Sequence, residues 1–357
     1  MKKRLKICIT CVGGHYMYDL ITALRSADDF SVYIVGVDAN PDSSGRFLVD
    51  AFEPVSFASQ DPQKYINQIK KICRQHDIDA VIPFSEQESR VLSQYKRDFE
   101  DLDVKISVGE FELVDLMTDK FKMLDVLKKK GVSTGPFFLV ESFGDVSSAL
   151  KALNYPKKPV VLKQRSGSGS KTVFILDENV KTYQPLLEDR ACGTGSLDVI
   201  CDYMKKGNLP FTNLIAVPFY GHKVCDIDCV VDQGKAVIVI PRLREYSNPL
   251  SPFNQGCQIY LKKNVVQYVK DICRAFGVHG PCDYDIAIEK DGTPRLLDAS
   301  CRLSGSVGAS FAAGANVPAQ LVRILFDLPR VQYKVKDGIR LRPYNHIEKV
   351  HNQGERP

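Results

Sequence analysis

The chain has 357 residues, of which 44% are hydrophobic and 25% are charged, proportions that are ordinary for a globular protein. No run of about 18 or more uncharged apolar residues occurs, so we expect no membrane-spanning helix and no membrane partner. The formal net charge of +5 suits an anionic ligand but is too small and too dispersed to indicate a nucleic-acid-binding protein.

The first third of the sequence alternates short apolar runs with amphipathic segments. Its basic start and first apolar run superficially resemble a signal peptide, but the run has only a strand's length and Gly13-Gly14 follows it. The alternation predicts a parallel sheet with helices on both faces. The predicted strands are Lys6–Thr10, Val32–Val37, Ala80–Phe84 and Lys105–Val108, and the predicted helices are Tyr16–Arg25 and Gln63–His76.

A helical segment is predicted at residues 112–131, which Gly131 ends. Beyond it, two predicted strands, Pro159–Lys163 and Thr172–Leu176, flank a Gly/Ser-rich loop and therefore predict a hairpin. Residues after about 330 are polar and basic, which indicates a short strand and a loose tail.

The segment from residue 213 to residue 298 predicts an antiparallel meander, a helix and a pair of strands. Gly234 marks the turn of the meander, and Gly292 marks the turn between the paired strands. The predicted meander strands are Asn213–Phe219, Asp226–Asp232 and Ala236–Pro241, the helix is Val265–Phe276, and the paired strands are Tyr284–Glu289 and Arg295–Asp298.

The eleven cysteines are scattered and lie mostly in apolar, strand-like runs. We therefore expect reduced core thiols in a cytoplasmic protein. Cys225 and Cys229 have a helical spacing next to His222, but they lie in a predicted strand, so we expect no zinc site.

The first candidate site is the loop Lys163-Gln-Arg-Ser-Gly-Ser-Gly-Ser-Lys171. Backbone N–H groups of a Gly/Ser loop can approach a phosphate closely because glycine has no Cβ, and Lys163 would neutralise phosphate charge. The loop lacks the Walker G-x-x-x-x-G-K-[ST] pattern, and alone it is equally consistent with a flexible hairpin tip. The candidate phosphate-binding residues of the loop are Ser166, Gly167, Ser168, Gly169 and Ser170.

The second candidate site lies on the paired strands near residue 290. Asp285 and Asp298 fall on adjacent strands, so their side chains can meet on one face and would repel each other without a cation between them. Ser300 shares the face of Asp298, because alternate residues of a strand point the same way, and Arg302 continues it. Mg²⁺ prefers such oxygen ligands, whereas the alternative interpretation is a solvated strand face.

Two weaker signals complete the set. Thr118-Asp119-Lys120 opens a predicted helix, where Asp119 or Thr118 can simply be an N-cap. Arg242-Leu-Arg244 places two arginines on one face, which suits phosphate or carboxylate.

The N-terminal residues offer a possible cofactor site of another kind. Val12-Gly-Gly14 and Asp38 resemble part of a dinucleotide site, but the third glycine of G-x-G-x-x-G is absent. We therefore interpret them as a tight turn between a strand and a helix.

From about residue 5 to residue 325, the order of these segments resembles the ATP-grasp superfamily, especially the branch of carbamoyl phosphate synthase large subunits and related carboxylate–amine ligases. Each motif is weak, but their order is fairly specific. The motifs are Lys6-Ile-Cys-Ile-Thr10, Gly36-Val-Asp-Ala-Asn-Pro41, Ala80-Val-Ile-Pro-Phe-Ser-Glu86, Asp119-Lys120, Gly131-Val-Ser-Thr-Gly-Pro136, Pro159–Lys171, Leu297-Asp-Ala-Ser-Cys-Arg-Leu-Ser-Gly-Ser306 and Gly314-Ala-Asn-Val-Pro318.

The resemblance implies a combined α/β and α+β fold. A Rossmann-like parallel-sheet domain would span residues 1–115. An ATP-grasp module of two antiparallel-sheet subdomains would follow, the first at 116–205 with a helical linker and the phosphate lid loop, and the second at 206–330 with the metal site. A C-terminal strand and tail would span 331–357.

The resemblance also implies a chemistry. ATP would lie between two antiparallel sheets, with Lys120, Lys163 and the loop 166–170 on its phosphates. Asp285 and Asp298, assisted by Ser300, would bind Mg²⁺, for which Mn²⁺ is an alternative. A substrate carboxylate would attack the γ-phosphate, Arg244 and Arg302 would hold the resulting acyl-phosphate, and an amine or ammonia-like nucleophile would displace phosphate. A homodimer is expected from the family alone.

The metal motif and the adenine side depart from the family pattern. Asp298, Ser300 and Cys301 stand where the family has Glu, Asn and Pro. Val217 replaces the adenine-side Glu, and Lys223 stands near a position where another acid is common. These departures put activity in doubt.

Two alternative functions therefore stay open. One is a nucleotide-binding ATP-grasp protein that has lost catalysis and serves as a regulatory or scaffolding subunit. The other is a nicotinamide-dependent oxidoreductase that uses residues 1–110. The substrate pocket has no shared motif, so the sequence does not rank its candidates Glu86, Glu88 and Asn254.

Overall fold

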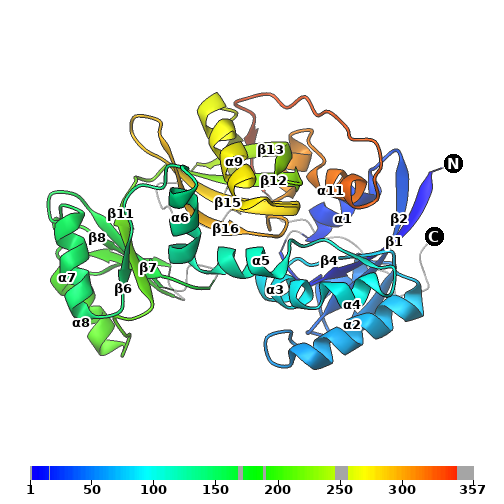
Figure 1. The fold of residues 1–357 in the computed structure, drawn as a ribbon, viewed down its shortest axis with the longest axis horizontal. Helices are drawn as coiled ribbons and strands as arrows, with labels where there is room; N and C mark the ends of the chain where they lie inside the picture. Colours follow the sequence, from blue (N-terminus) through cyan, green and yellow to red (C-terminus); the bar gives the residue numbers. More distant parts are fainter. Residues whose placement is uncertain (1, 16, 168–171, 188–189, 246–255, 344–357) are drawn as a thin grey trace.

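The computed structural model describes residues 2–15, 17–167, 172–187, 190–245 and 256–343. The described structure contains three β-sheets, each of which forms the centre of one unit, and the three units lie side by side along the molecule (Figure 1). The unit built around the third sheet lies in the middle, between the parallel-sheet domain and the unit of the second sheet. No helix in the described ranges is long and apolar enough to cross a membrane.

The first unit is a five-stranded parallel sheet with helices on both faces, as the sequence predicts. Its strand order is β3-β2-β1-β4-β5. Ile7 and Ile9 of β1 pack with α1, whereas Cys8 packs with α2 on the opposite face. Its elements are β1 (Lys3–Thr10), α1 (Met17–Arg25), β2 (Phe30–Asp38), the 3₁₀ helix η1 (Ser44–Phe47), β3 (Ala51–Pro54), α2 (Pro62–His76), β4 (Ala80–Ile82), α3 (Glu86–Gln94), α4 (Lys96–Glu100) and β5 (Lys105–Ile106).

The predicted helical segment 112–131 is two helices, α5 (Phe111–Thr118) and α6 (Lys120–Lys129), that meet at Asp119. The Asp119 side chain accepts a hydrogen bond of 3.1 Å from the Lys122 amide and so caps α6. Apolar residues of both helices, among them Met117 and Leu124, pack against the third sheet. The two helices therefore fix Lys120, the first residue of α6, beside that sheet.

The second unit is a six-stranded sheet with the order β6-β11-β7-β8-β10-β9. The predicted hairpin is confirmed, because β7 and β8 pair antiparallel with Lys163 opposite Val173. The elements of the unit are β6 (Phe138–Val140), α7 (Phe143–Ala152), β7 (Val160–Gln164), β8 (Thr172–Leu176), β9 (Gln184–Leu187), β10 (Ala191–Gly195), α8 (Leu197–Lys206) and β11 (Leu214–Pro218).

The predicted meander is wrong at its first strand. β11 pairs with β6 and β7 of the second sheet, not with β12. Pro218 ends the strand, and Gly221 follows with φ of +102°, so a linker rather than a tight turn leads to β12. By sheet membership, β11 therefore belongs to the second unit.

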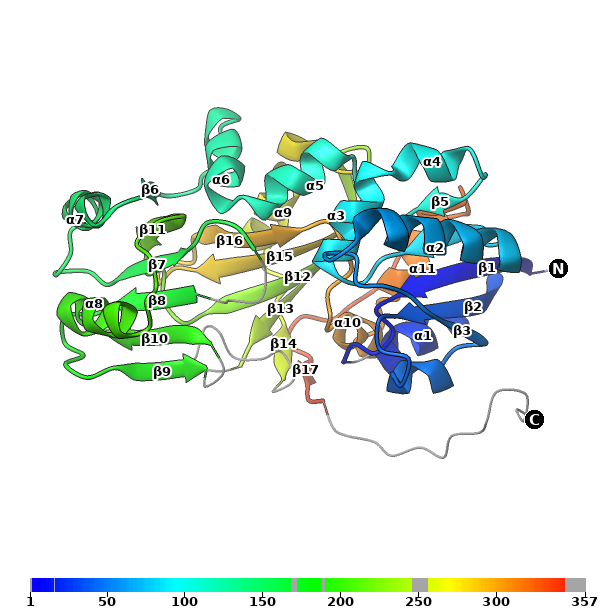
Figure 2. The same cartoon turned by 90° about the horizontal axis from the view of Figure 1, so that it is seen from below.

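The third unit is a sheet with the order β16-β15-β12-β13-β14-β17, and the hairpins β12–β13 and β15–β16 are confirmed. Helix α9 packs through Val269 and Ile272 on one face of this sheet (Figures 1 and 2). The elements are β12 (Val224–Asp232), β13 (Lys235–Arg244), β14 (Cys257–Ile259), α9 (Lys263–Phe276), β15 (Gly280–Ile288), β16 (Pro294–Ser300), α10 (Gly308–Ala312), α11 (Val317–Leu325) and β17 (Arg340–Leu341).

The third unit and the first share one hydrophobic core. Leu321 of α11 and Val230 of β12 pack in the same cluster as Leu20 of α1. The Arg323 guanidinium adds a two-bond ion pair to Asp29, at 2.8 and 2.9 Å. The cysteines are free thiols, and all except Cys11 are buried, which agrees with the expectation of core thiols.

Candidate active site

A cavity of about 680 Å³ lies between the second and third sheets and reaches the first unit. Its apolar end lies against β7, β8 and the segment after β11. Its middle is lined by charged side chains of the third sheet, and its far end is lined by loops of the first unit. Representative residues of the three parts are Val161, Ile175, Val217 and Phe219 at the apolar end, Lys120, Lys163, Asp285, Asp298 and Arg302 in the middle, and Gly14, His15, Phe84 and Glu86 at the far end.

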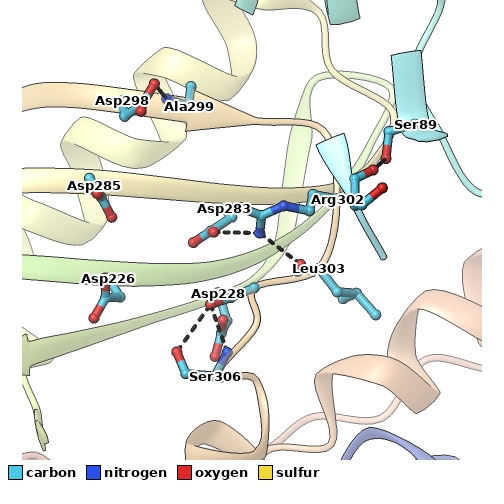
Figure 3. A network of polar contacts seen from close by, with 12 residues as sticks. Ser89, Asp226, Asp228, Asp283, Asp285, Asp298, Ala299, Arg302, Leu303 and Ser306 are labelled. Atoms are coloured by element: carbon cyan, nitrogen blue, oxygen red, sulfur yellow. Dashed lines mark hydrogen bonds and ion pairs between the residues drawn. The ribbon is translucent and has the colours of Figure 1, made fainter. Parts of the chain in front are cut away.

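Acidic side chains follow one another across the cavity face of the third sheet. Asp298 on β16 pairs with Asp285 on β15, which pairs with Asp226 on β12. In the next row, Asp283 stands between Ser300 and Asp228. Residues two apart in a strand point the same way, so both rows lie on one face, as Figure 3 shows. The prediction that Asp285 and Asp298 are brought together is borne out by this register.

Cations from other elements contact these carboxylates. Arg244 on β13 donates to Asp226 at 3.0 Å and to Asp285 at 2.9 Å. The Lys120 ammonium lies 3.1 Å from Asp298. Burial, together with the Asp226, Asp283 and Asp298 charges, raises the pKa of Asp285 to about 7 although Arg244 opposes the shift. Binding of a further cation next to these carboxylates would therefore reduce the repulsion between them.

The donor set of the second candidate site fits a magnesium ion that also binds phosphate. The hydroxyl oxygen of Ser300 and one carboxylate oxygen of Asp283 are buried, and neither has a hydrogen-bond partner among the described residues. Within the described residues, no three His, Cys, Asp or Glu side chains form a group that could hold a metal ion. Mg²⁺ is commonly held by one or two carboxylates with phosphate oxygens and water, so Asp285, Asp298 and Ser300 remain its predicted ligands.

Two buried lysines converge opposite the acidic rows. The Lys163 ammonium at the end of β7 donates to the Leu297 carbonyl at 2.7 Å, and that of Lys120 donates to the Gly167 carbonyl at 2.9 Å. Burial and the nearby Lys120 charge lower the pKa of Lys163 to about 8. Two cations crowded together without solvent favour binding of a polyanion.

Arg165 connects the segments that carry the two lysines, and its role was not predicted from the sequence. Its guanidinium donates to both Asp119 carboxylate oxygens, at 2.9 and 2.7 Å, and its carbonyl accepts from the Lys120 amide at 2.9 Å. This bidentate pair fixes the start of α6 to the end of β7. Arg165 follows directly after the end of β7, in the same loop motif as Lys163.

Arg302 and Arg242 have different surroundings. The Arg302 guanidinium lines the cavity and donates to Asp283 at 2.7 Å (Figure 3). Arg242 is 1% exposed and donates to Asp228 at 3.0 Å and to the Ser304 and Ser306 hydroxyls. Burial disfavours its charge, but the Asp228 and Asp226 carboxylates raise the pKa of Arg242 above its ordinary value. Arg302 and Arg244 therefore border the cavity, whereas Arg242 supports the loop 304–306.

Replacing Arg242 with methionine should destabilise the protein by about 3–5 kcal/mol, because Asp228 is then a buried charge without its partner. Urea denaturation should show this as an earlier midpoint. Arg274→Ala, at an exposed pair, should cost about 0–1 kcal/mol. An Arg242→Met protein as stable as the wild type would contradict the assignment.

The remaining predicted residues divide into two groups. Ser166 accepts from the Asn213 side chain at 3.3 Å, and Gly167 lines the cavity. Ser168, Gly169, Ser170 and Asn254 lie outside the described residues.

The turn after β1 is held by a hydrogen bond to Asp38, the last residue of β2. The Gly13 amide donates to Asp38 at 2.7 Å, so this carboxylate holds the turn instead of standing free for a ribose. A Cβ on Gly13 would lie 2.6 Å from the Ser43 hydroxyl oxygen, which explains the glycine by close packing. The tight-turn interpretation fits this geometry better than a dinucleotide site does.

Comparisons with known proteins agree with this arrangement. Residues 210–347 match the family model described as ATP-grasp in the biosynthetic pathway with Ter operon. Residues 7–107 match the model of the PylC-like N-terminal domain. By these matches, residues 210–347 carry an ATP-grasp domain and residues 7–107 carry a PylC-like N-terminal domain. A search of curated protein sequences gave no match.

Solved structures share the ATP-grasp architecture at low sequence identity. L-amino acid ligase from Bacillus licheniformis has a TM-score of 0.64 at 14% identity, over 91% of this chain and 75% of that chain. N5-carboxyaminoimidazole synthetase from Staphylococcus aureus has a TM-score of 0.68 at 14% identity, over 94% and 81%. The biotin carboxylase domain of Hydrogenobacter thermophilus 2-oxoglutarate carboxylase, solved as a dimer with MgADP, ADP and bicarbonate, has a TM-score of 0.66 at 15% identity, over 93% and 72%.

The structure shows what surrounds the residues that depart from the ATP-grasp pattern. Asp298 is one methylene shorter than the usual Glu, yet Lys120 contacts it directly. Cys301, where the family has Pro, points away into the core and contacts Met117. Val217 lines the apolar end of the cavity, where the ATP-grasp pattern has an acid. The charged middle of the cavity is thus present, and the cavity wall is apolar at Val217.

Proposed function

We propose that this protein is an ATP- and Mg²⁺-dependent ligase that activates a carboxylate as an acyl-phosphate and joins it to an amine or ammonia-like nucleophile. The observation that carries the proposal is the convergence of Lys120 and Lys163 with Asp285 and Asp298 in one cavity between the second and third sheets. The names of the similar structures, which include an L-amino acid ligase and a biotin carboxylase domain complexed with MgADP and bicarbonate, support it.

The nucleotide would enter with its base at the apolar end and its phosphates between the lysines. Lys120 and Lys163 would offset the phosphate charge, and the Gly167 backbone leaves room for a phosphate close to the chain. Mg²⁺, or Mn²⁺ in its place, held by Asp285, Asp298 and Ser300 would draw the phosphate oxygens together and screen their charge.

Arg302 and Arg244 would act on the other substrate. Arg302 stands at the junction of the acidic rows and the first unit, where it would bind and orient the carboxylate that attacks the γ-phosphate. Arg244 would hold Asp226 and Asp285 in place and face the transferred group. Exclusion of water from the site once its substrates are bound would protect the acyl-phosphate until the amine arrives.

The test is a phosphate-release screen of the purified protein with ATP, Mg²⁺ or Mn²⁺, and pools of amino acids and other carboxylates. Release that depends on a carboxylate and on the metal is the expected result. Nucleotide binding without metal dependence and without release would support the degenerate ATP-grasp alternative. An NADH fluorescence titration that showed binding would instead support the oxidoreductase.

Affinity for MgADP should be highest near neutral pH. Below about 7, the protonated Asp285 carboxyl no longer attracts the metal, so affinity falls as pH decreases. Above about 8, Lys163 loses its proton and its attraction for phosphate, so affinity falls as pH increases. Calorimetric titrations across this range test both limbs. Lys163→Arg should remove the alkaline fall because arginine stays charged, and an unchanged alkaline limb in that variant would contradict the assignment.

A further inference from the structure

The first unit forms one end wall of the cavity, and this wall carries one acidic residue that lines the cavity, Glu86. Glu86 is the first residue of α3, whose N-cap is Ser85. Negative charge is favoured in the first turn of a helix, where backbone N–H groups point outward. Figure 2 places α3 at the boundary between the first unit and the third sheet. Phe84, His15 and Gly14 border the same end of the cavity.

The side chain of the neighbouring Glu88 is buried behind this wall and does not line the cavity. Its carboxylate accepts hydrogen bonds from the Ser85 and Thr10 hydroxyls, both at 2.7 Å, and lies 3.4 Å from the Tyr65 hydroxyl. Burial raises the pKa of Glu88. Its own amide donates to Ser85, so the two residues cap α3 reciprocally. Of the two glutamates that the sequence could not rank, Glu86 is therefore the one that faces the cavity.

Among the described residues, the other acids that line the cavity come from the third sheet and not from the first unit. Asp226 and Asp285 receive hydrogen bonds from Arg244, Asp283 receives one from Arg302, and Asp298 contacts Lys120. All four belong to the third sheet. Glu86 lines the same cavity from the first unit, and its negative charge, after that of Asp283, raises the pKa of Arg302. A molecule held there would have Arg302 on one side and Glu86 on the other.

We propose that Glu86 binds the ammonium group of the amine substrate, which is therefore an amine that is cationic in water. This inference rests on the proposed ligase function. The lysines that suit ATP would repel such a cation from the middle of the cavity, so it needs a carboxylate of its own at the far end. From that wall the nitrogen faces the substrate carboxylate that Arg302 orients.

The test separates the two halves of the reaction. Hydroxylamine is uncharged at neutral pH and traps an acyl-phosphate as a hydroxamate, so it reports carboxylate activation without needing an ammonium site. Amide formation with the amino acids of the screen, each supplied singly as the amine, reports the second half. In Glu86→Gln, we expect hydroxamate formation within twofold of the wild type, and a KM for the amine raised about 10- to 100-fold, as for a lost charged hydrogen bond. The KM for ATP should not change.

Glu112→Gln is the matched control, because it removes an exposed glutamate from the first turn of α5, outside the cavity. Its amine KM should equal that of the wild type. An unchanged amine KM in Glu86→Gln overturns the assignment and leaves the ligase function standing. Equal loss of hydroxamate and amide also overturns it, because Glu86 then serves activation. A wild-type protein that forms no hydroxamate overturns the ligase function and this inference together.

Discussion

Replacing Asp298 with alanine should abolish substrate-dependent ADP release while the protein stays folded. The side chain is 36% exposed to the cavity, so its loss removes little packing. It does remove one of two carboxylates predicted to hold the metal, and it leaves Lys120 without its nearest acid. We expect turnover to fall by about a hundredfold or more, as when one preorganised electrostatic contact is lost from an active site. A coupled ADP-release assay measures the effect.

Asp298→Asn and Asp291→Ala sharpen this experiment. The asparagine keeps the shape but not the charge, and it should need more Mg²⁺ for the same rate. Asp291 is an exposed aspartate in the turn between the same two strands, so its alanine variant should behave as the wild type. Wild-type turnover in Asp298→Ala would remove the basis of the metal assignment.

Replacing Lys163 with alanine should weaken ATP binding by about 1.5–3 kcal/mol, the scale of a lost hydrogen bond to a charged group. Lys163 is buried, and its ammonium donates to the uncharged Leu297 carbonyl, so its charge is available to an anion in the cavity. Isothermal titration calorimetry with ATP measures the change.

Lys122→Ala provides the comparison for Lys163→Ala. Lys122 is an exposed lysine of α6 two residues from Lys120, so its loss should leave the affinity for ATP unchanged. Lys163→Arg should retain most of the affinity, because the charge remains. Equal ATP affinity in the wild type and in Lys163→Ala would place the phosphates elsewhere.

Much of the fold follows from local patterns in the sequence. Apolar residues at helical spacing gave α2, and the turn at Gly292 gave the β15–β16 hairpin with Asp285 opposite Asp298. The sheet to which β11 belongs could not be predicted. Ile215 packs toward the third unit and Leu214 toward α7 and α8, so both faces are apolar and periodicity carries no direction. The Gly-rich strand β10 has low strand propensity and was missed.

The candidate site was predictable where its residues are close in sequence, and not where they are distant. Asp226 was missed because it lies in an otherwise apolar strand and its partner Arg244 lies on the next one. The Arg165–Asp119 pair joins residues 46 positions apart, which no local pattern reports. The choice between Glu86 and Glu88 depends on which side of α3 meets the cavity, and that requires the packed domain.

The core that joins α1 to α11 has a consequence for how the chain matures at the ribosome. Asn316 donates to the Ala23 carbonyl at 2.6 Å, and the apolar side of α1 is completed by residues some three hundred positions downstream. In a nascent chain that has been synthesised only through its first sheet, the apolar side of α1 stays exposed until α11 is synthesised. The first unit therefore cannot finish folding cotranslationally as an independent module, and its completion is a late event in biogenesis.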